Sequence, residues 1–169
     1  MEAGLSAAGA EQMQLKVRPI GYVKTSASRE ELRHGSSLSE IVVDRKFAAG
    51  LQGVEDYSHV YVLFWLHETP KRSYRARVHP RGRQDIKEVG IFATRSPRRP
   101  NPIGLTLVRL LRKRGRVLTV RGLDAYNRTP VLDLKPHDSL DDRLKVRVPQ
   151  WWRKLRRENQ AAGHLQRPQ

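Results

Sequence analysis

One unbroken run of seven apolar residues restricts the possible folds of this chain more than any other feature. It reads Val-Tyr-Val-Leu-Phe-Trp-Leu from Val60 to Leu66, between His59 and His67. β-Branched and aromatic residues dominate the run, which is typical of a strand. An unbroken apolar strand is either buried on both faces or part of a closed barrel. We therefore predict a strand over Val54–His67, either buried on both faces or part of a closed barrel.

Short β-prone segments separated by turn residues fill most of the remaining chain. We predict strands at Arg18–Lys24, Glu40–Asp44, Arg75–His79, Val89–Phe92, Leu105–Leu111, Val117–Val120 and Val131–Leu134, and a loop over Thr25–Ser39. Helical character is limited to Arg45–Leu51 and to the basic segment Trp151–Asn159. About eight short strands with so little helix predict a mainly β chain, a single-domain antiparallel β-barrel with one or two short helices.

The same pattern sets the domain boundaries and excludes some nucleotide-binding folds. We expect residues 1–14 to form a disordered tail, residues 15–160 the barrel domain with its C-terminal helix, and residues 161–169 a frayed end. A doubly wound sheet is excluded because the helices between strands are missing. The chain also contains no G-x-G-x-x-G and no P-loop.

Charge and cysteine content restrict the binding partners and the chemistry that this chain can have. The formal net charge is +16, and a protein this basic usually binds a polyanion. The absence of cysteine excludes disulfides and thiol nucleophiles, and we predict no metal. No apolar run reaches the length of a membrane span, and the N-terminus lacks a signal pattern, so we expect a cytoplasmic protein without a membrane partner.

The segment Gly90–Gly104 reads Gly-Ile-Phe-Ala-Thr-Arg-Ser-Pro-Arg-Arg-Pro-Asn-Pro-Ile-Gly. Its prolines restrict the backbone conformation, so its arginine side chains extend from a rigid segment. Such an arrangement suits the binding of phosphate or carboxylate groups. With the basic arm Lys71–Arg83, it predicts a nucleic-acid surface that includes Arg75, Arg77, Arg98, Arg99 and Asn101. The alternatives are a solvated, proline-braced turn and an edge strand whose charges discourage pairing.

Four blocks, in order, resemble the TsaA-like family of tRNA N6-methyltransferases, which act on threonylcarbamoyl-adenosine beside the anticodon. They are Ile20–Ser26, Leu51–His67, Phe92–Leu105 and Thr129–Pro136, within residues 18–142. The resemblance implies S-adenosylmethionine bound on a β-barrel, a tRNA substrate, and a homodimer with the cofactor pocket near the subunit interface.

The resemblance also implies site residues. The expected cofactor-binding residues are His67, Glu68, Arg95, Leu105, Asp124, Ala125, Tyr126 and Asn127. Asp133 is the candidate for orienting the target amine or accepting its proton, and Lys135 for holding a substrate phosphate or carboxylate. For this pair the alternative is a cross-strand ion pair of little energetic weight.

The chain departs from the family pattern at three places. Ser26 is followed by Ala27 without the usual proline, Asn127-Arg128 replaces an Asp-Gly pair, and His137 replaces a tyrosine. These departures favour an alternative, a non-catalytic RNA-binding barrel that retains a vestigial cofactor pocket. A third hypothesis, a basic structural or ribosome-associated protein, explains the charge but not the four blocks.

Overall fold

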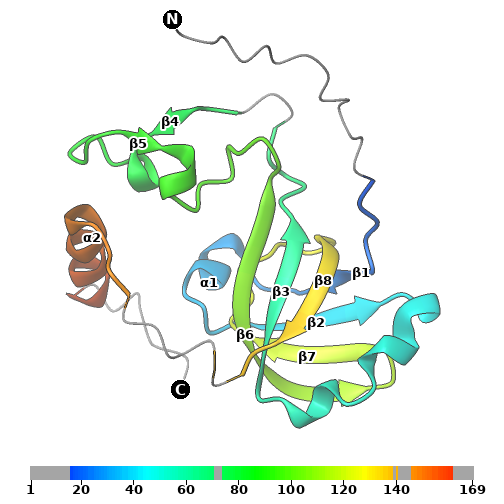
Figure 1. The fold of residues 1–169 in the computed structure, drawn as a ribbon. Coiled ribbons are helices and arrows are strands. Elements are labelled where there is room, and N and C mark those ends of the chain that lie inside the picture. The colour runs from blue at the N-terminus through cyan, green and yellow to red at the C-terminus, as the bar shows by residue number, and fades with distance from the viewer. Residues whose placement is uncertain (1–15, 71–73, 139, 141–145, 162–169) are drawn as a thin grey trace, which may run out of the picture.

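Six antiparallel strands form a closed barrel in the computed structural model, which describes residues 16–70, 74–138, 140 and 146–161 (Figure 1). The order around the barrel is β1-β2-β7-β6-β3-β8. The strands are β1 (Gly21–Lys24), β2 (Leu38–Val43), β3 (His59–Trp65), β6 (Ile103–Arg114), β7 (Val117–Arg121) and β8 (Pro130–Pro136). The predicted mainly β barrel is thus confirmed. The predicted tail 1–14, residues 162–169 of the predicted tail 161–169, and part of the arm at 71–73 lie outside the described residues.

Closure of the barrel, rather than burial on both faces, explains the apolar run in β3. Val60, Val62 and Phe64 point into the core, whereas the residues between them are only partly buried. The strand is shorter than predicted, because Val54–Asp56 form the 3-10 helix η2. A second 3-10 helix, η1 (Arg45–Leu51), occupies the segment predicted to be helical.

β1 and β2 approach so closely at Gly21 that no side chain fits there. A Cβ atom on Gly21 would lie 2.3 Å from the backbone oxygen of Val42, which cannot rotate away. We therefore expect Gly21→Ala to lower the free energy of unfolding by at least about 2 kcal/mol, through forced backbone displacement. For a domain of this size that is a fall of about 4–8 °C in Tm.

Gly90→Ala is the matched control, because a Cβ there meets nothing within 4 Å and Gly90 has a φ of −58°. Its Tm should stay within about 2 °C of the parent, by the same scaling. Equal melting temperatures for the two variants in a calorimetric scan would contradict the close approach.

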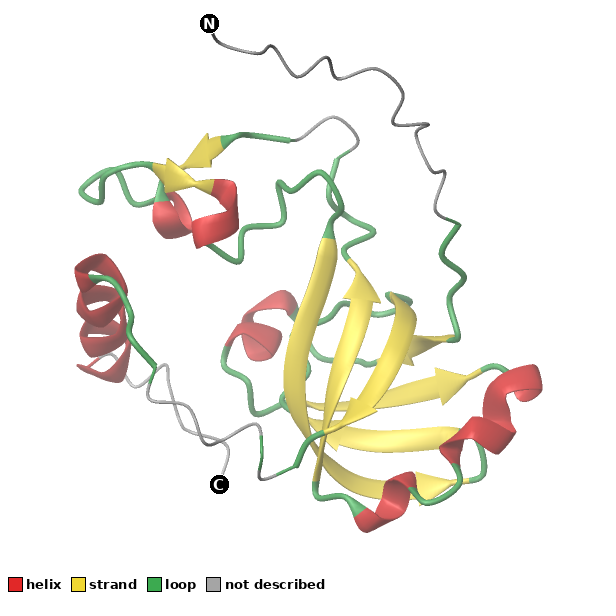
Figure 2. Cartoon of the chain, in the orientation of Figure 1, coloured by secondary structure: helices red, strands yellow, loops and turns green. Residues whose placement is uncertain are grey.

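Residues 66–102 form an insertion between β3 and β6, beyond one end of the barrel (Figure 2). Its elements are β4 (Arg77–Val78), η3 (Pro80–Gly82), β5 (Val89–Gly90) and η4 (Ile91–Ala93), with β4 and β5 paired as a separate sheet. The predicted strand Val89–Phe92 is therefore wrong beyond Gly90. The chain turns there because Ile91 is buried and its carbonyl accepts hydrogen bonds from the Thr94 backbone N–H and side-chain hydroxyl.

Two α-helices complete the described part of the chain. α1 (Arg29–Arg33) lies in the segment predicted to be a loop, and Ser28 and Glu31 form a capping box at its N-terminus. α2 (Gln150–Ala161) matches the predicted C-terminal helix and extends beyond it at both ends. None of the helices in the described part of the chain combines the length and apolar character of a membrane span.

Candidate functional site

The first candidate region, which we call the strand-end cluster, gathers residues from distant parts of the chain. It consists of Arg29, His67, Glu68, Thr106, Thr129 and the turn Asp124–Asn127. His67 Nδ1 lies 3.2 Å from the Thr129 hydroxyl, joining the residues after β3 to those before β8. Glu68 accepts a hydrogen bond from Arg29 on α1, and the Arg29 guanidinium stacks 4.7 Å from the centre of the Tyr126 ring.

Burial of alternate residues positions the Asp124–Asn127 turn. Leu123 and Ala125 are buried in the core, which leaves Asp124 exposed between them. The Asp124 carboxylate accepts a hydrogen bond from the Thr106 hydroxyl of β6. The Asn127 side-chain oxygen accepts a hydrogen bond of 3.2 Å from the Thr25 backbone N–H. The turn is thus attached to both β6 and the segment before α1.

One departure from the family pattern falls at a special backbone position in this turn. Arg128 has a φ of +65°, in the left-handed region that favours glycine. A glycine, as in the family's Asp-Gly pair, would adopt this conformation without steric cost. The turn keeps its geometry here despite an unfavourable residue, since the Arg128 N–H donates to Val23 O at 2.7 Å.

Asp133, Lys135 and Leu105 lie together on a different surface, the outer face of the sheet. Leu63 is in register with both Leu105 and Asp133, and Tyr61 is in register with Lys135. Asp133 and Lys135 form an ion pair of 2.9 Å between exposed side chains. Since both residues belong to β8, this ion pair is formed within one strand and not across strands.

The second candidate region, which we call the arginine groove, runs between the insertion and α2 and has a volume of about 1420 Å³. Among the described residues, its lining contains six arginines and one carboxylate, Glu88. The arginines are Arg75, Arg77, Arg81, Arg95, Arg98 and Arg156. Phe92, Trp151 and Trp152 add aromatic surface. The described lining of the groove therefore combines a large excess of positive charge with aromatic rings.

Ion pairs hold α2 against the insertion. Arg83 pairs with Asp85 at 2.7 Å and with Glu158 of α2 at 2.8 Å, and Lys154 of α2 pairs with Asp85 at 2.9 Å. Leu155 of α2 and Ile86 of the insertion are both buried. Because Asp85 and Glu158 are engaged in these ion pairs, their carboxylates do not neutralise the arginines that line the groove.

The docking of α2 should depend on pH. Hydrogen bonds from Arg83 and Lys154 hold the pKa of Asp85 well below its usual range. A carboxylate with a depressed pKa stabilises the folded arrangement above its ordinary pKa, and this contribution is lost as pH falls toward the folded-state value. We expect α2 to stay docked at neutral pH and to loosen below about pH 4, the ordinary aspartate value.

Fluorescence of Trp151 and Trp152 in a Trp65→Phe background measures this transition. An Asp85→Asn control should show looser docking at neutral pH and a smaller acid transition. An acid transition of unchanged amplitude in that control would assign the titration to other groups.

Most of the predicted site residues fall into three places, and Arg99 and Asn101 lie outside them. His67, Glu68 and Asp124–Asn127 meet in the strand-end cluster, Leu105 lies on the outer face with Asp133 and Lys135, and Arg95 lines the groove with Arg75, Arg77 and Arg98. Arg99 braces its own loop, donating to Thr94 O at 2.8 Å. Asn101 is exposed, and its carbonyl accepts from the Ile103 N–H.

Sequence reasoning missed several residues of both regions. Arg29 could have been found from the pattern Ser28-x-x-Glu31, which marks a helix start. Trp152 and Arg156 were placed on a helix, but nothing local indicated that this helix forms one wall of a groove. Among the described residues, no group of three or more histidine and acidic side chains is arranged to hold a metal ion.

Comparison with known proteins places these features in a family. A sequence model of the tRNA-methyltransferase O N-terminal domain matches residues 24–143. A protein of Methanothermobacter thermautotrophicus, named probable S-adenosyl-L-methionine-binding protein, is 42% identical over 74% of this chain and 91% of its own length. The mouse tRNA (adenine(37)-N6)-methyltransferase is 41% identical over 67% of this chain, which spans only 26% of that enzyme.

A solved structure extends the likeness to three dimensions. The crystal structure of TrmO from Pseudomonas aeruginosa superimposes with a TM-score of 0.65 at 26% identity, covering 90% of this chain and 77% of that one. The family match covers most of the chain and includes the whole strand-end cluster, from Arg29 to Thr129. The chain therefore belongs to the tRNA-methyltransferase O N-terminal domain family.

Proposed function

We propose that the protein is an S-adenosylmethionine-dependent tRNA methyltransferase that methylates N6 of an adenosine beside the anticodon. One observation carries the proposal: residues 67–68 and 124–127, far apart in the sequence and both expected to bind cofactor, meet in the strand-end cluster, where His67 contacts Thr129 next to the turn. The names of the archaeal and mouse relatives support the cofactor and the reaction.

The chemistry of the strand-end cluster suits S-adenosylmethionine. This cofactor supplies an electrophilic methyl group on its sulfonium. The exposed Asp124 carboxylate can accept hydrogen bonds from the ribose hydroxyls, and the main chain of Ala125–Asn127 offers donors and acceptors for an adenine edge. A carboxylate also stabilises a neighbouring cation such as the sulfonium. Glu68 could supply it by exchanging its present partner, Arg29.

Methylation of an exocyclic amine needs a group that orients the amine and accepts its proton, because the nitrogen lone pair is delocalised. We assign this role to Asp133, and to Lys135 the recognition of a carboxylate on the threonylcarbamoyl group. The two side chains are exposed and paired with each other on the outer face. The substrate would have to compete with Asp133 for Lys135. The carboxylate of the substrate would then replace Asp133 as the ion-pair partner of Lys135.

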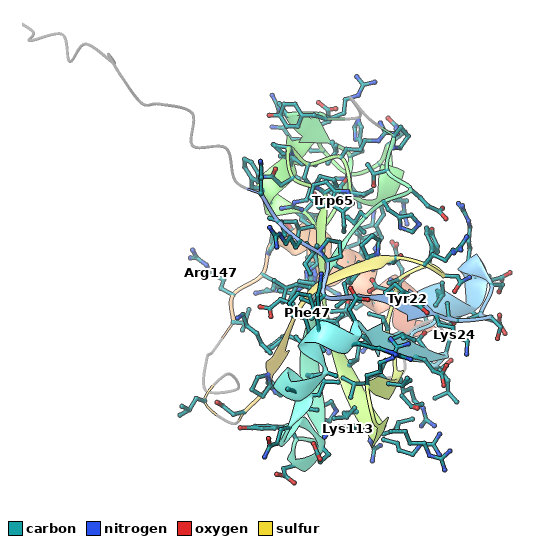
Figure 3. All side chains as sticks on the ribbon, turned by 90° about the vertical axis from the view of Figure 1, so that its right-hand side faces the viewer. Tyr22, Lys24, Phe47, Trp65, Lys113 and Arg147 are labelled. Atoms are coloured by element: carbon teal, nitrogen blue, oxygen red, sulfur yellow. The ribbon has the colours of Figure 1, made fainter. Side chains whose placement is uncertain are left out.

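We also propose that the outer face is the interface of a homodimer. It carries Leu63, Trp65, Ile103 and Leu105 from β3 and β6, and Leu105 is 49% exposed. Trp65 lies at the end of the barrel nearer the insertion, and Lys113 at the opposite end (Figure 3). Exposed apolar patches of this kind mark protein contacts. A second copy on this face would have to leave Asp133 and Lys135 accessible to tRNA and bring its own strand-end cluster beside them, because the methyl donor and the target amine must meet.

Leu105→Glu should therefore produce a monomer with little methyl transfer, because a buried carboxylate without a partner opposes association. Leu38→Glu is a matched control, since Leu38 is 53% exposed on β2, away from this face. Light scattering after gel filtration gives the mass of each variant. A Leu105→Glu dimer, or a parent protein that is monomeric at the assay concentration, would contradict the interface.

The function itself is tested with the full chain, labelled S-adenosylmethionine and unfractionated tRNA. We expect heat of binding with S-adenosylmethionine, transfer of the label to tRNA, and an N6-methylated adenosine derivative by nucleoside mass spectrometry. Cofactor and tRNA binding without transfer would favour the non-catalytic barrel. Binding of tRNA alone would favour a basic structural protein. A cytoplasmic location remains a prediction.

A further inference from the structure

We propose that the arginine groove binds an unpaired segment of RNA, and that α2 supplies one of its two base-stacking walls. The inference rests on the proposed function, because it takes the RNA to be the tRNA substrate. It adds a binding site for the bases themselves and assigns a role to a helix outside the residues matched to the family.

Charge indicates the class of ligand. In the described part of the chain, six arginines and one carboxylate line the groove, and Oε1 of that carboxylate, Glu88, lies 3.9 Å from Nε2 of His79. Asp85 and Glu158, the other acidic groups where α2 meets the insertion, are engaged by Arg83 and Lys154. A polyanion is therefore the complementary partner, and its phosphates can be bound at several points along the groove.

Exposed rings indicate that this polyanion has bases. Phe92 on the insertion is 75% exposed, and Trp152 on α2 is 38% exposed. A guanidinium lies over each ring, that of Arg99 at 5.9 Å from Phe92 and that of Arg156 at 5.5 Å from Trp152. Aromatic rings and arginine planes are the surfaces on which unpaired bases stack. A base-paired helix hides its base faces and could not use them.

The position of α2 explains why both walls are required. The insertion supplies Phe92, Arg95 and Arg98, whereas α2 supplies Trp152 and Arg156. The ion pairs of Arg83 and Lys154 join these two parts to each other. A segment lying in the groove therefore contacts side chains that are separated by more than fifty positions in the sequence. An acidic peptide would satisfy the arginines but not the rings.

The test measures binding, without methyl transfer, of two fluorescent RNA probes of equal length to the full chain. One probe is a stem–loop with an unpaired loop, and the other is a duplex. We expect Trp152→Leu and Phe92→Leu each to weaken stem–loop binding about tenfold, within the range known for loss of one stacked base. Binding of the duplex should change less than twofold.

Tyr22→Leu is the control, because Tyr22 is exposed on β1 of the barrel (Figure 3) and should have no effect on either probe. Arg98→Gln should weaken both probes and reduce the salt dependence of binding by about one unit of slope. Thermal melts identify variants that fail to fold. At position 152, Trp152→Phe keeps an aromatic ring and should restore the stem–loop binding that Trp152→Leu loses.

Several results would overturn the proposal. One is an unchanged affinity for the stem–loop in Trp152→Leu and Phe92→Leu. Another is an equal loss of affinity for the stem–loop and for the duplex. A third is displacement of the bound stem–loop by polyglutamate as effectively as by unlabelled stem–loop. Failure of the proposed function is distinguishable. A parent protein that binds the stem–loop through these rings but does not bind S-adenosylmethionine would refute the methyltransferase and leave the groove assignment intact.

Discussion

Arg95→Lys should reduce methyl transfer by about a hundredfold or more, which corresponds to about 2.7 kcal/mol of transition-state stabilisation. The backbone on both sides of Arg95 is braced. The Ser96 N–H donates to the Thr94 hydroxyl at 3.2 Å, and Arg99 donates to the Thr94 carbonyl at 2.8 Å. Arg95 itself is exposed, and among the described residues no acidic partner pairs with it.

A braced backbone beneath an unpaired guanidinium suits bidentate recognition of an oxyanion. Lysine keeps the positive charge but lacks the planar fork, so only a role in geometry makes this substitution severe. Single-turnover rates with a thermal melt measure the effect, and Arg114→Lys in the β6–β7 hairpin is the control. Activity of the Arg95 variant within about threefold of the parent, less than 1 kcal/mol, would remove Arg95 from the site.

Steady-state kinetics of the same variant distinguish the two oxyanions that Arg95 could bind. If it binds the cofactor carboxylate, the variant should have a raised KM for S-adenosylmethionine. If it binds an RNA phosphate in the arginine groove, the KM for tRNA should rise instead. The position of Arg95 among the groove arginines favours RNA, whereas the family resemblance favours the cofactor.

Asp124→Asn should weaken S-adenosylmethionine binding by about tenfold to a hundredfold. Hydrogen bonds to a charged group contribute about 1.5–3 kcal/mol, and each 1.4 kcal/mol is a factor of ten in Kd. The substitution keeps the size of the side chain but removes the charge and one acceptor. Burial of Leu123 and Ala125 keeps the backbone of the turn in place, so the expected loss is local.

Titration calorimetry with S-adenosylhomocysteine and S-adenosylmethionine measures the change. Asp56→Asn in η2 is the control, because this exposed acid lies outside the strand-end cluster. Thr106→Val, which removes the hydroxyl bound to Asp124, should produce a smaller loss by leaving the carboxylate less well oriented. An Asp124→Asn affinity within twofold of the parent would exclude Asp124 as a cofactor ligand.

Much of the barrel could be predicted because strand signals are local. The apolar run in β3 and the β-prone residues in β6, β7 and β8 are local signals, and these strands overlap the segments that were predicted. The errors occurred where a local preference met a tertiary constraint. Phe92 is β-prone but belongs to η4, because β5 ends at Gly90 and the chain turns about the buried Ile91.

The sequence by itself determined the barrel class, the positive charge and the family blocks, because these follow from residue types and their spacing. Only the tertiary structure decided which residues share a surface. Closure of the barrel brings His67 to Thr129 across 62 positions, yet leaves Leu105 and Asp133 on the outer face. Ion pairs between α2 and the insertion likewise create a groove from segments with no common local pattern, since contacts between distant positions depend on the path of the whole chain.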